Sequence, residues 1–414
     1  MRTLKKIPLV GKMLIGLVIG GICGFIFGEK MSVVSPIGDL FLNLLMMCVI
    51  PLIFCNLVSG IASLGDVKAF GKIGGGLLIY YTVTTILSII IGTLTAVWLK
   101  PGAGYVLVEG GGEMATTMPN LLETIVGLFP SNIFAALSSG NMAQVVFFCV
   151  FLGVALMTLP KESSEPLLRM FQLLAQLFNN LIGMIMKFAP IGMACLFGSQ
   201  VGKNGTAIVS VIGKFAVGMY GGTALMFIVY CISIQVLAHY SPMSFLKNAF
   251  PVMVTGVATN SSNATIPTTM KWTENMGVAK KVSDFAIPLG AVMNKNGMGL
   301  FLSLTFLFTA QSIGATVSLS MLLKMMVIGL ILTTGAGGVA GGQIVVLSIL
   351  LNTFGMPTEA IAVVMAITPF TDPAQTIANI ISDMAAAKVV DARARINAKK
   401  HGEQYYDTVS GVTQ

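Results

Sequence analysis

Long apolar stretches recur along this chain from Leu9 to Met384, and they constrain its fold more than any other feature. Several of them reach or approach the roughly 20 residues that a helix needs to cross the hydrocarbon core of a bilayer. Charged residues make up only 10% of the chain, whereas a typical soluble domain carries about 25%. The sequence therefore predicts an all-α polytopic membrane protein.

The formal net charge of +8 comes from basic residues at both ends of the chain and in short connecting segments. Lysine and arginine are enriched in the cytoplasmic segments of membrane proteins. This pattern predicts a multi-pass protein of the cell membrane, the inner membrane in a bacterium, with both termini in the cytoplasm and no affinity for nucleic acid. The basic start leads directly into the first apolar run, so we expect no cleavable signal peptide.

Residues that would indicate an enzyme are sparse. The six cysteines lie in apolar segments without the spacing of metal ligands, and the two histidines, His239 and His401, lie in a predicted loop and tail. No Ser/His/Asp or zinc-type arrangement is visible. We expect neither an enzyme nor a cofactor, apart from an ion such as sodium or a proton that could drive transport.

The pattern of spans changes near residue 241. Before it, the sequence predicts spans at about 13–27, 36–63, 75–99, 121–159 (segmented), 166–198 and 206–237. After it, polar and glycine-rich interruptions appear at 255–269, 288–299 and 333–343. Irregular backbone at membrane depth is tolerated only when it is buried in protein or lines a wet cavity. Paired interruptions predict inverted repeats, two re-entrant helical hairpins and a substrate site between them.

A polar stripe is expected on the last apolar helix. Gln375, Thr376, Asn379 and Asp383 follow Asp372 by three, four, seven and eleven residues, which places each of them within about 60° of Asp372 on a helix. The other faces carry the apolar residues Ile377, Ala378, Ile380, Ile381, Met384 and Ala385. Because a carboxylate within a membrane is costly, such a stripe indicates a binding site that lines a cavity.

A set of motifs resembles the glutamate transporter family, also called the dicarboxylate/amino acid:cation symporters. They are PIGDLF from Pro36 with PLIF from Pro51, YY from Tyr80 with TT from Thr84, FAPIG from Phe188, NSSNATIP from Asn260, PLGAVMN from Pro288 and GAGGVAGG from Gly335. The stripe matches the family pattern D-x-x-R-T-x-x-N-x-x-x-D at every position except the arginine.

The resemblance implies eight transmembrane helices, two re-entrant hairpins, a homotrimer and an elevator-type transporter whose mobile domain slides past a fixed scaffold. It divides the chain as follows: scaffold helices 1 and 2 in 1–74, transport-domain helix 3 in 75–100, an external loop and segmented scaffold helix 4 in 101–164, scaffold helix 5 in 165–200, transport-domain helix 6 in 201–240, the transport-domain core in 241–390, and a cytoplasmic tail in 391–414.

The resemblance also implies a substrate site. Its residues would be Ser261, Ser262, Asn263 and Thr265 on the first hairpin, Gly338 and Val339 on the second, and Asp372, Gln375, Thr376 and Asn379 on the last helix. Asp372 would bind a substrate ammonium, and Asn379 and Thr376 would bind its carboxylate. Pairing of Asp372 with Lys295 is the alternative role for that carboxylate.

Gln375 is the departure that bears on substrate choice. It occupies the position of the arginine with which acidic-substrate members bind the side-chain carboxylate, and Asn260 offers no replacement cation. A second buried negative charge would then lack a partner, at a penalty of several kcal/mol. This favours a neutral amino acid as substrate. A sodium- or proton-coupled symporter of acidic amino acids or dicarboxylates is the alternative.

A second set of departures concerns coupling ions. The resemblance implies a cation site, or its surrogate, at Tyr81, Thr84, Thr85, Asn294, Lys295, Asn296, Asn379 and Asp383, with sodium ligands among Tyr81, Thr84, Thr85, Asn294, Asn296 and Asp383. Asn296 and Lys295 replace the aspartate and methionine of the family's NMDGT motif, and Ala336 and Val292 replace two threonines. Fewer oxygen ligands weaken a hard-cation site.

We therefore predict reduced or absent sodium coupling, with Lys295 in place of a bound cation. Persistent sodium coupling through the remaining ligands and proton coupling through Lys295 are the alternatives. An anion channel is the rival from a different functional class, although filters of channels are rings about an axis rather than a single stripe. The expected partners are an amino acid substrate, the lipid bilayer and further copies of the chain.

Overall fold

The computed structural model describes residues 9–62, 72–107, 129–139, 142–205, 207–335, 342–357 and 359–401. Every regular element in these ranges is a helix, as predicted. The helices are α1 (Leu9–Phe27), η2 (Gly28–Val34), α2 (Ser35–Ala62), α4 (Lys72–Leu99), α6 (Ile133–Ser139), α7 (Met142–Thr158), α8 (Lys161–Ile185), α9 (Ala189–Asn204), α10 (Ala207–Ala238), α11 (Pro242–Thr259), α12 (Ser262–Asn275), α13 (Lys280–Met293), α14 (Asn296–Ser312), α15 (Leu319–Gly335), α16 (Gly342–Thr353) and α17 (Ala360–His401).

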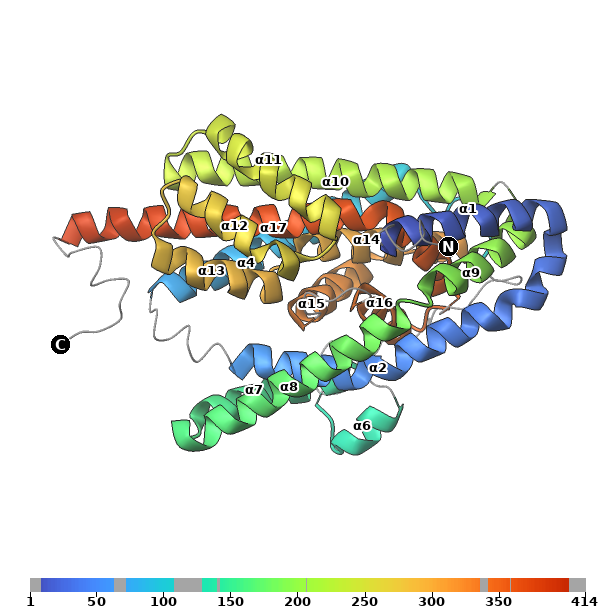
Figure 1. Ribbon diagram of the computed structural model, residues 1–414, viewed down its shortest axis with the longest axis horizontal. Coiled ribbons are helices and arrows are strands. Elements are labelled where there is room, and N and C mark those ends of the chain that lie inside the picture. Colours follow the sequence, from blue (N-terminus) through green and yellow to red (C-terminus); the bar gives the residue numbers. More distant parts are fainter. Residues whose placement is uncertain are drawn as a thin grey trace, which may run out of the picture.

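One group of helices is built around α2, which contacts α7, α8 and α9 along its length (Figure 1). The sequence predicts a single span over 166–198, but the structure has two helices there, α8 and α9, with an angle of 60° between them. Pro190 lies in the first turn of α9. A proline ring is compatible with a helix start but clashes with the preceding turn inside a helix, so the span bends at this point.

The contact between α1 and α9 depends on small residues. A Cβ atom added to Gly16, Gly20 or Gly24 would lie 2.3, 2.2 or 2.5 Å from a carbonyl oxygen of α9. These glycines are four residues apart and therefore lie on one face of α1. Small residues at this spacing let two membrane helices approach backbone to backbone. The two helices pack side by side because no side chain separates them.

A second group of helices surrounds α14 and α17 (Figure 1). All residues of α14 are buried except Gln311, and α17 contacts α4, α10, α11, α12, α13 and α14. A helix that is apolar and buried on all sides belongs at the centre of a large bundle. These two helices carry Asn296 and the five residues of the predicted stripe, which therefore lie inside this second group. The division into a scaffold and a transport domain stays a prediction.

The interruptions expected after residue 241 are present where the structure describes them. α11 and α12 form a helical hairpin whose turn is at Asn260, a residue with a left-handed φ of 46°. The helix over 280–312 is broken between Met293 and Asn296, which separates α13 from α14. α15 and α16 pack against each other, and the tip between them falls outside the described residues. α17 continues past Lys388 to His401, beyond the predicted start of the tail.

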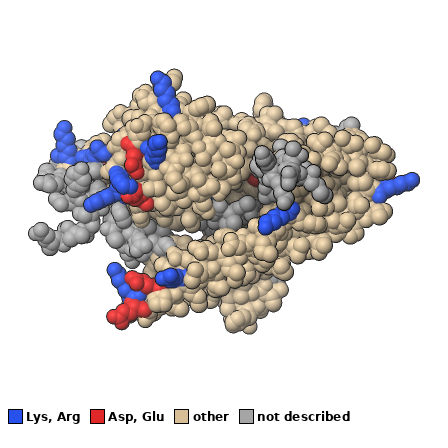
Figure 2. All heavy atoms as spheres, in the orientation of Figure 1, with Lys and Arg blue, Asp and Glu red and all other residues tan. Residues whose placement is uncertain are grey.

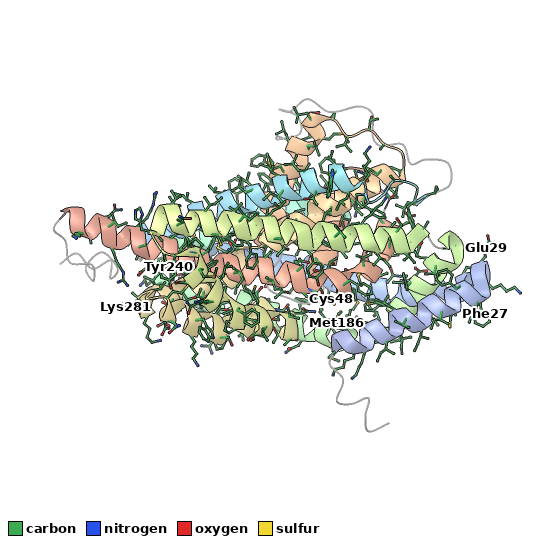
Figure 3. The ribbon with its side chains drawn as sticks, turned by 90° about the horizontal axis from the view of Figure 1, so that it is seen from above. Phe27, Glu29, Cys48, Met186, Tyr240 and Lys281 are labelled. Atoms are coloured by element: carbon green, nitrogen blue, oxygen red, sulfur yellow. The ribbon has the colours of Figure 1, made fainter. Side chains whose placement is uncertain are left out.

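The outer surface fits a lipid environment. α10 buries Phe215 and Tyr230 on one side, while Val217, Ile228 and Val236 on the other are 57%, 55% and 61% exposed. Most of the charged side chains on this face gather toward the end that carries the base of the α11–α13 segment and the start of α8, and only a few appear over the rest of it (Figure 2). Phe27 and Glu29 lie at one end of the molecule and Tyr240 and Lys281 toward the other (Figure 3).

Three stretches in the described part of the chain are long and apolar enough to cross a membrane by length and composition, Gly11–Ala62, Ile73–Leu99 and Ala207–Ala238. The bent pair of α8 and α9 makes a fourth if it is one span. Gly11–Ala62 includes α1, η2 and α2, so this stretch holds two of the predicted spans. The total of eight spans, the re-entrant arrangement of the hairpins and the elevator motion stay predictions.

Candidate functional site

The predicted polar stripe is one face of α17. Gln375, Thr376, Asn379 and Asp383 are all at most 7% exposed, and Asp372 is partly buried. The stripe faces the broken segment between α13 and α14, because Asn379 and Asp383 both bond to it. A buried row of this kind is stable only if its polar atoms have partners.

Asp383 is the deepest carboxylate of the stripe, with 1% of its surface exposed. Its Oδ1 accepts a hydrogen bond of 2.8 Å from Asn294 Nδ2. A Cβ atom on Gly290 would lie 2.3 Å from the same oxygen and 2.9 Å from the hydroxyl of Tyr81. Only glycine at position 290 therefore leaves room for Asp383 and Tyr81 to approach α13. Tyr81 itself donates to the carbonyl of Ala286 at 3.0 Å.

Lys295 is the only lysine or arginine among the fully buried side chains of the described residues, at 2% exposure. Its ammonium donates to the carbonyl of Ala291, and Asp383 is the charged group that interacts with it electrostatically. Lys295 thus lies in the region predicted to bind a cation, and it faces Asp383 rather than Asp372. The two opposite charges reduce the penalty that each would pay alone in the core.

Asn296 is the centre of a network that joins α14 to three other helices. Its Oδ1 accepts from Thr85 at 3.0 Å, and its Nδ2 donates to Tyr230 at 2.9 Å and to Ser382 at 2.7 Å. Both ends of this amide therefore have protein partners. Thr84 donates to the carbonyl of Tyr80 at 2.9 Å, within its own helix. Asn294 differs, because its buried Oδ1 has no hydrogen-bond partner among the residues that the structure describes.

The opposite end of the stripe is polar but contains no cation. Asp372 Oδ1 accepts a bond of 2.6 Å from Nε2 of Gln343, a residue at the start of α16. Gln375 Nε2 donates to the sulfur of Met298 at 3.5 Å, and its buried Oε1 has no partner within the described ranges. Asn379 Oδ1 accepts from the backbone N–H of Gly297 at 2.8 Å. A small molecule with both donors and acceptors could exchange for several of these bonds.

The last part of α11 lies near the stripe, since a Cβ on Gly256 would lie 3.6 Å from the methyl group of Thr376. Ser261 caps α12 by accepting from the N–H of Ala264 at 3.3 Å. Thr265 bonds within its own helix, to the carbonyl of Ser262 at 2.7 Å. Ser262 and Thr265 are buried, whereas Asn263 is exposed. Gly338 and Val339 lie outside the described residues.

The structure adds site residues that pattern reasoning missed. Gln343 bonds Asp372, Met298 bonds Gln375, and Tyr230 and Ser382 complete the Asn296 network. Ser382 precedes Asp383 and could have been suspected from the sequence, whereas Tyr230 is 66 positions from Asn296. In the described ranges, no group of three or more His, Cys, Asp or Glu residues could hold a metal ion.

Comparison with known proteins shows which family the chain resembles along its length. The family model described as the sodium:dicarboxylate symporter family matches residues 9–393. The proton/sodium-glutamate symport protein of Bacillus caldotenax is 32% identical, over 97% of this chain and 98% of that protein. The one from Geobacillus stearothermophilus is 31% identical over the same shares, 97% and 98%.

A C4-dicarboxylate transport protein of Bacillus subtilis (strain 168) is 29% identical, over 92% of each chain. The matches extend along nearly the whole chain and include the segments that form the buried site. The family consists of secondary transporters rather than enzymes. The chain therefore belongs to the sodium:dicarboxylate symporter family, as its resemblance to the glutamate transporters implied.

Proposed function

We propose that this protein is a cation-coupled symporter of a small carboxylate, an acidic amino acid or a C4-dicarboxylate. The similar proteins carry names of this kind, proton/sodium-glutamate symport and C4-dicarboxylate transport. They support the alternative drawn from the sequence better than they support a neutral amino acid transporter with reduced coupling. The structural observation that carries the proposal is the buried polar stripe of α17 against the α13–α14 break.

The substrate would lie between the hairpin tips and the Asp372 end of the stripe. The start of α12, with Ser261 and Ser262, would present backbone N–H groups to a carboxylate, since the positive end of a helix dipole favours anions. Asp372 would exchange its bond with Gln343 for a substrate ammonium, if one is present. The free Oε1 of Gln375 would accept a further donor.

The coupling cation would bind at the opposite end of the stripe. Asp383, the free Oδ1 of Asn294 and the hydroxyl of Tyr81 supply oxygen atoms suited to sodium. Lys295 interacts with the same carboxylate and would compete with a bound ion. Sodium can occupy this end only if the ammonium moves away or loses its proton, and a proton released by Lys295 would itself be a coupling ion.

A neutral amino acid remains the second candidate, and Gln375 is the observation that favours it. No guanidinium is among the buried side chains of the described ranges. The charge of a second substrate carboxylate would then be balanced by Lys295 or by backbone dipoles alone. A neutral zwitterion would need no such partner, because Asp372 and the start of α12 suffice for its two charges.

Transport by purified protein in liposomes tests the proposal. Uptake of labelled glutamate, succinate and serine would be measured with an inward sodium gradient, with choline in place of sodium, and with or without a proton gradient. We expect saturable uptake of glutamate or succinate that requires one of the two gradients. Saturable uptake of serine alone would reverse the choice of substrate, and an unsaturable anion current without uptake would indicate a channel.

The location and assembly follow from the same proposal. We infer a multi-pass protein of the cell membrane that has cytoplasmic termini, forms a homotrimer and moves its substrate by an elevator motion. The basic residues near both ends of the chain support the orientation. Crosslinking of the protein in native membranes would give trimers as its largest product, and dimers alone would contradict the assembly.

A further inference from the structure

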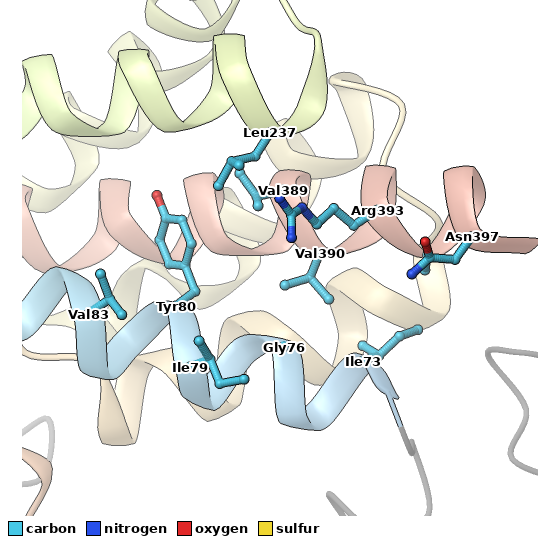
Figure 4. Close-up of a pocket in the computed structure, with 11 residues that line it drawn as sticks. Ile73, Gly76, Ile79, Tyr80, Val83, Leu237, Val389, Val390, Arg393 and Asn397 are labelled. Atoms are coloured by element: carbon cyan, nitrogen blue, oxygen red, sulfur yellow. The ribbon is translucent and has the colours of Figure 1, made fainter.

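A groove on the outside of the second helix group holds an unpaired cation. It is formed by α4, α10 and the last part of α17, and its volume is about 300 Å³ (Figure 4). Most of its lining is apolar and comes from Ile73, Ile79, Val83, Leu237, Val389 and Val390. The polar side chains of Arg393 and Asn397 come from the last part of α17. The predicted transport site uses none of these residues.

Arg393 extends over the groove rather than away from it. Figure 4 shows its guanidinium pointing back toward Val389 and Leu237. The residue is exposed, and in the described part of the chain this guanidinium has no hydrogen-bond or ion-pair partner. An arginine held against apolar surface at the edge of a membrane needs an anion, and its planar fork fits two oxygens of a phosphate.

The walls of the groove fit an aliphatic chain. Tyr80 donates to or accepts from Ser233 at 2.8 Å, which ties α4 to α10 and fixes one wall. Gly76 forms part of the floor, where the nearest atoms to an added Cβ would be the methyl groups of Val390, at 3.4 Å, so a large side chain there would fill the groove. Ile79 and Val83 continue the apolar surface along α4 and are 68% and 50% exposed. No described element covers them, so lipid is their natural neighbour.

We propose that this groove binds an anionic phospholipid, with the phosphate on Arg393 and one acyl chain along Ile79 and Val83. The charge of the surrounding helix favours this occupant, since Lys388, Arg395 and Lys399 lie on the same final turns of α17. Clusters of basic residues beside a membrane helix attract anionic lipids of the cytoplasmic leaflet. The site is independent of the transported substrate.

The test measures lipid binding to the detergent-purified full chain by native mass spectrometry. The ligands are dioleoyl phosphatidylglycerol, dioleoyl phosphatidylcholine and water-soluble glycerol phosphate. Arg393→Gln removes the cation, Gly76→Leu fills the floor, and Lys281→Gln is the control with the same loss of charge at another exposed basic residue. Gel filtration and the melting temperature establish that each variant is folded.

We expect phosphatidylglycerol to bind at least tenfold more tightly than phosphatidylcholine. Arg393→Gln should weaken phosphatidylglycerol about tenfold and leave phosphatidylcholine unchanged, Gly76→Leu should weaken both lipids, and Lys281→Gln neither. The proposal is wrong if Arg393→Gln binds phosphatidylglycerol as the wild type does. It is also wrong if glycerol phosphate binds as tightly as the lipid and Gly76→Leu has no effect, because the site would then recognise a free phosphate.

Discussion

At the scale of single residues, the two ends of the α17 stripe differ in kind. The carboxylate of Asp383 accepts a hydrogen bond from Asn294 and interacts with the opposite charge of Lys295. Asp372 accepts a hydrogen bond from the side chain of Gln343, the second residue of α16, and this is its side-chain partner among the described residues. A bond from a neutral amide to a carboxylate can be exchanged for a substrate ammonium, whereas a buried pair of charges is harder to separate.

Gln343→Ala tests the role of that amide. A hydrogen bond to a charged group contributes about 1.5–3 kcal/mol, so its loss leaves Asp372 a stronger attractor for an ammonium and a stronger repeller of anions. We expect the preference for glutamate over succinate to rise about tenfold in competition uptake. Gln235→Ala, on the exposed face of α10, is the matched control. An unchanged preference would mean that Gln343 is displaced by neither substrate.

Lys295→Met tests the cation end of the stripe. Removing the ammonium leaves the carboxylate of Asp383 without its opposite charge, which raises its affinity for another cation. We expect the sodium concentration for half-maximal uptake to fall several-fold, or sodium dependence to appear where the wild type has none. If the dependence on sodium and on pH both stay as in the wild type, Lys295 does not stand in for a cation.

At the scale of elements, two contacts hold helices in register by different means. α1 and α9 meet through glycines, and the end of α17 is bonded to the turn between α12 and α13. There, Lys388 donates to the carbonyl of Met276 at 2.8 Å, Asp391 accepts from the N–H of Ala279 at 3.2 Å, and Arg395 donates to the carbonyl of Gly277 at 2.8 Å. These bonds fix the base of the first hairpin to α17.

Gly20→Leu is expected to separate α1 from α9. The added side chain would meet the carbonyl of Ala194, whose backbone cannot move aside as a flexible side chain would. Overpacking of this kind typically costs about 1–3 kcal/mol. The melting temperature of the Gly20→Leu variant in detergent should fall below that of the Gly213→Leu variant, because a Cβ at position 213 meets nothing within 4 Å. Equal melting temperatures would show that the close approach of α1 and α9 is not needed.

Asp391→Ala is expected to loosen the base of the first hairpin. The carboxylate is 1% exposed and also bonds Arg395 at 2.9 Å, so its removal leaves both the N–H of Ala279 and the guanidinium short of a partner. The loss should be about 1–3 kcal/mol. Hydrogen exchange of residues 276–282 should become faster while that of α1 stays the same. Unchanged exchange in this turn would contradict the role of the carboxylate.

At the scale of the whole molecule, the two helix groups meet at several places, among them α9 against α17 and α2 against α15. α2 of the first group and α13 of the second approach at Gly60 and Val292, where a Cβ on Gly60 would lie 4.0 Å from Cγ1 of Val292. A cavity of mixed lining also separates these helices, with the polar residues Asn56 and Asn179 on one side and Asp284 on the other. An interface with polar gaps suits two bodies that slide, since little apolar packing is lost in the motion.

A disulfide between Gly60→Cys and Val292→Cys tests this motion. A Cβ atom at position 60 would lie 4.0 Å from Cγ1 of Val292, so two cysteines there would be neighbours in the observed arrangement. If the groups slide during transport, oxidation should abolish uptake in the double variant and reduction should restore it. Each single variant and the wild type, which has six cysteines of its own, are the controls. Full uptake by the crosslinked protein would exclude relative motion at this interface.

The sequence by itself determined the helical class, the family and most of the stripe. Apolar length and helical spacing are local properties, so Asp372, Gln375, Thr376, Asn379 and Asp383 could be assigned to one face from their order alone. The first hairpin and the break before Asn296 were also predicted. Glycine and polar residues interrupt an apolar run within a membrane only where the backbone is buried in protein or lines a wet cavity.

Only the tertiary structure decided which side chains become partners. Gln343 with Asp372, Tyr230 with Asn296 and Lys295 with Asp383 join residues far apart in the chain or across a helix break. The bend between α8 and α9 and the glycine contact of α1 were likewise not predicted. Spacing fixes the face on which a side chain lies, whereas the partner on that face depends on how helices pack, which no local pattern encodes.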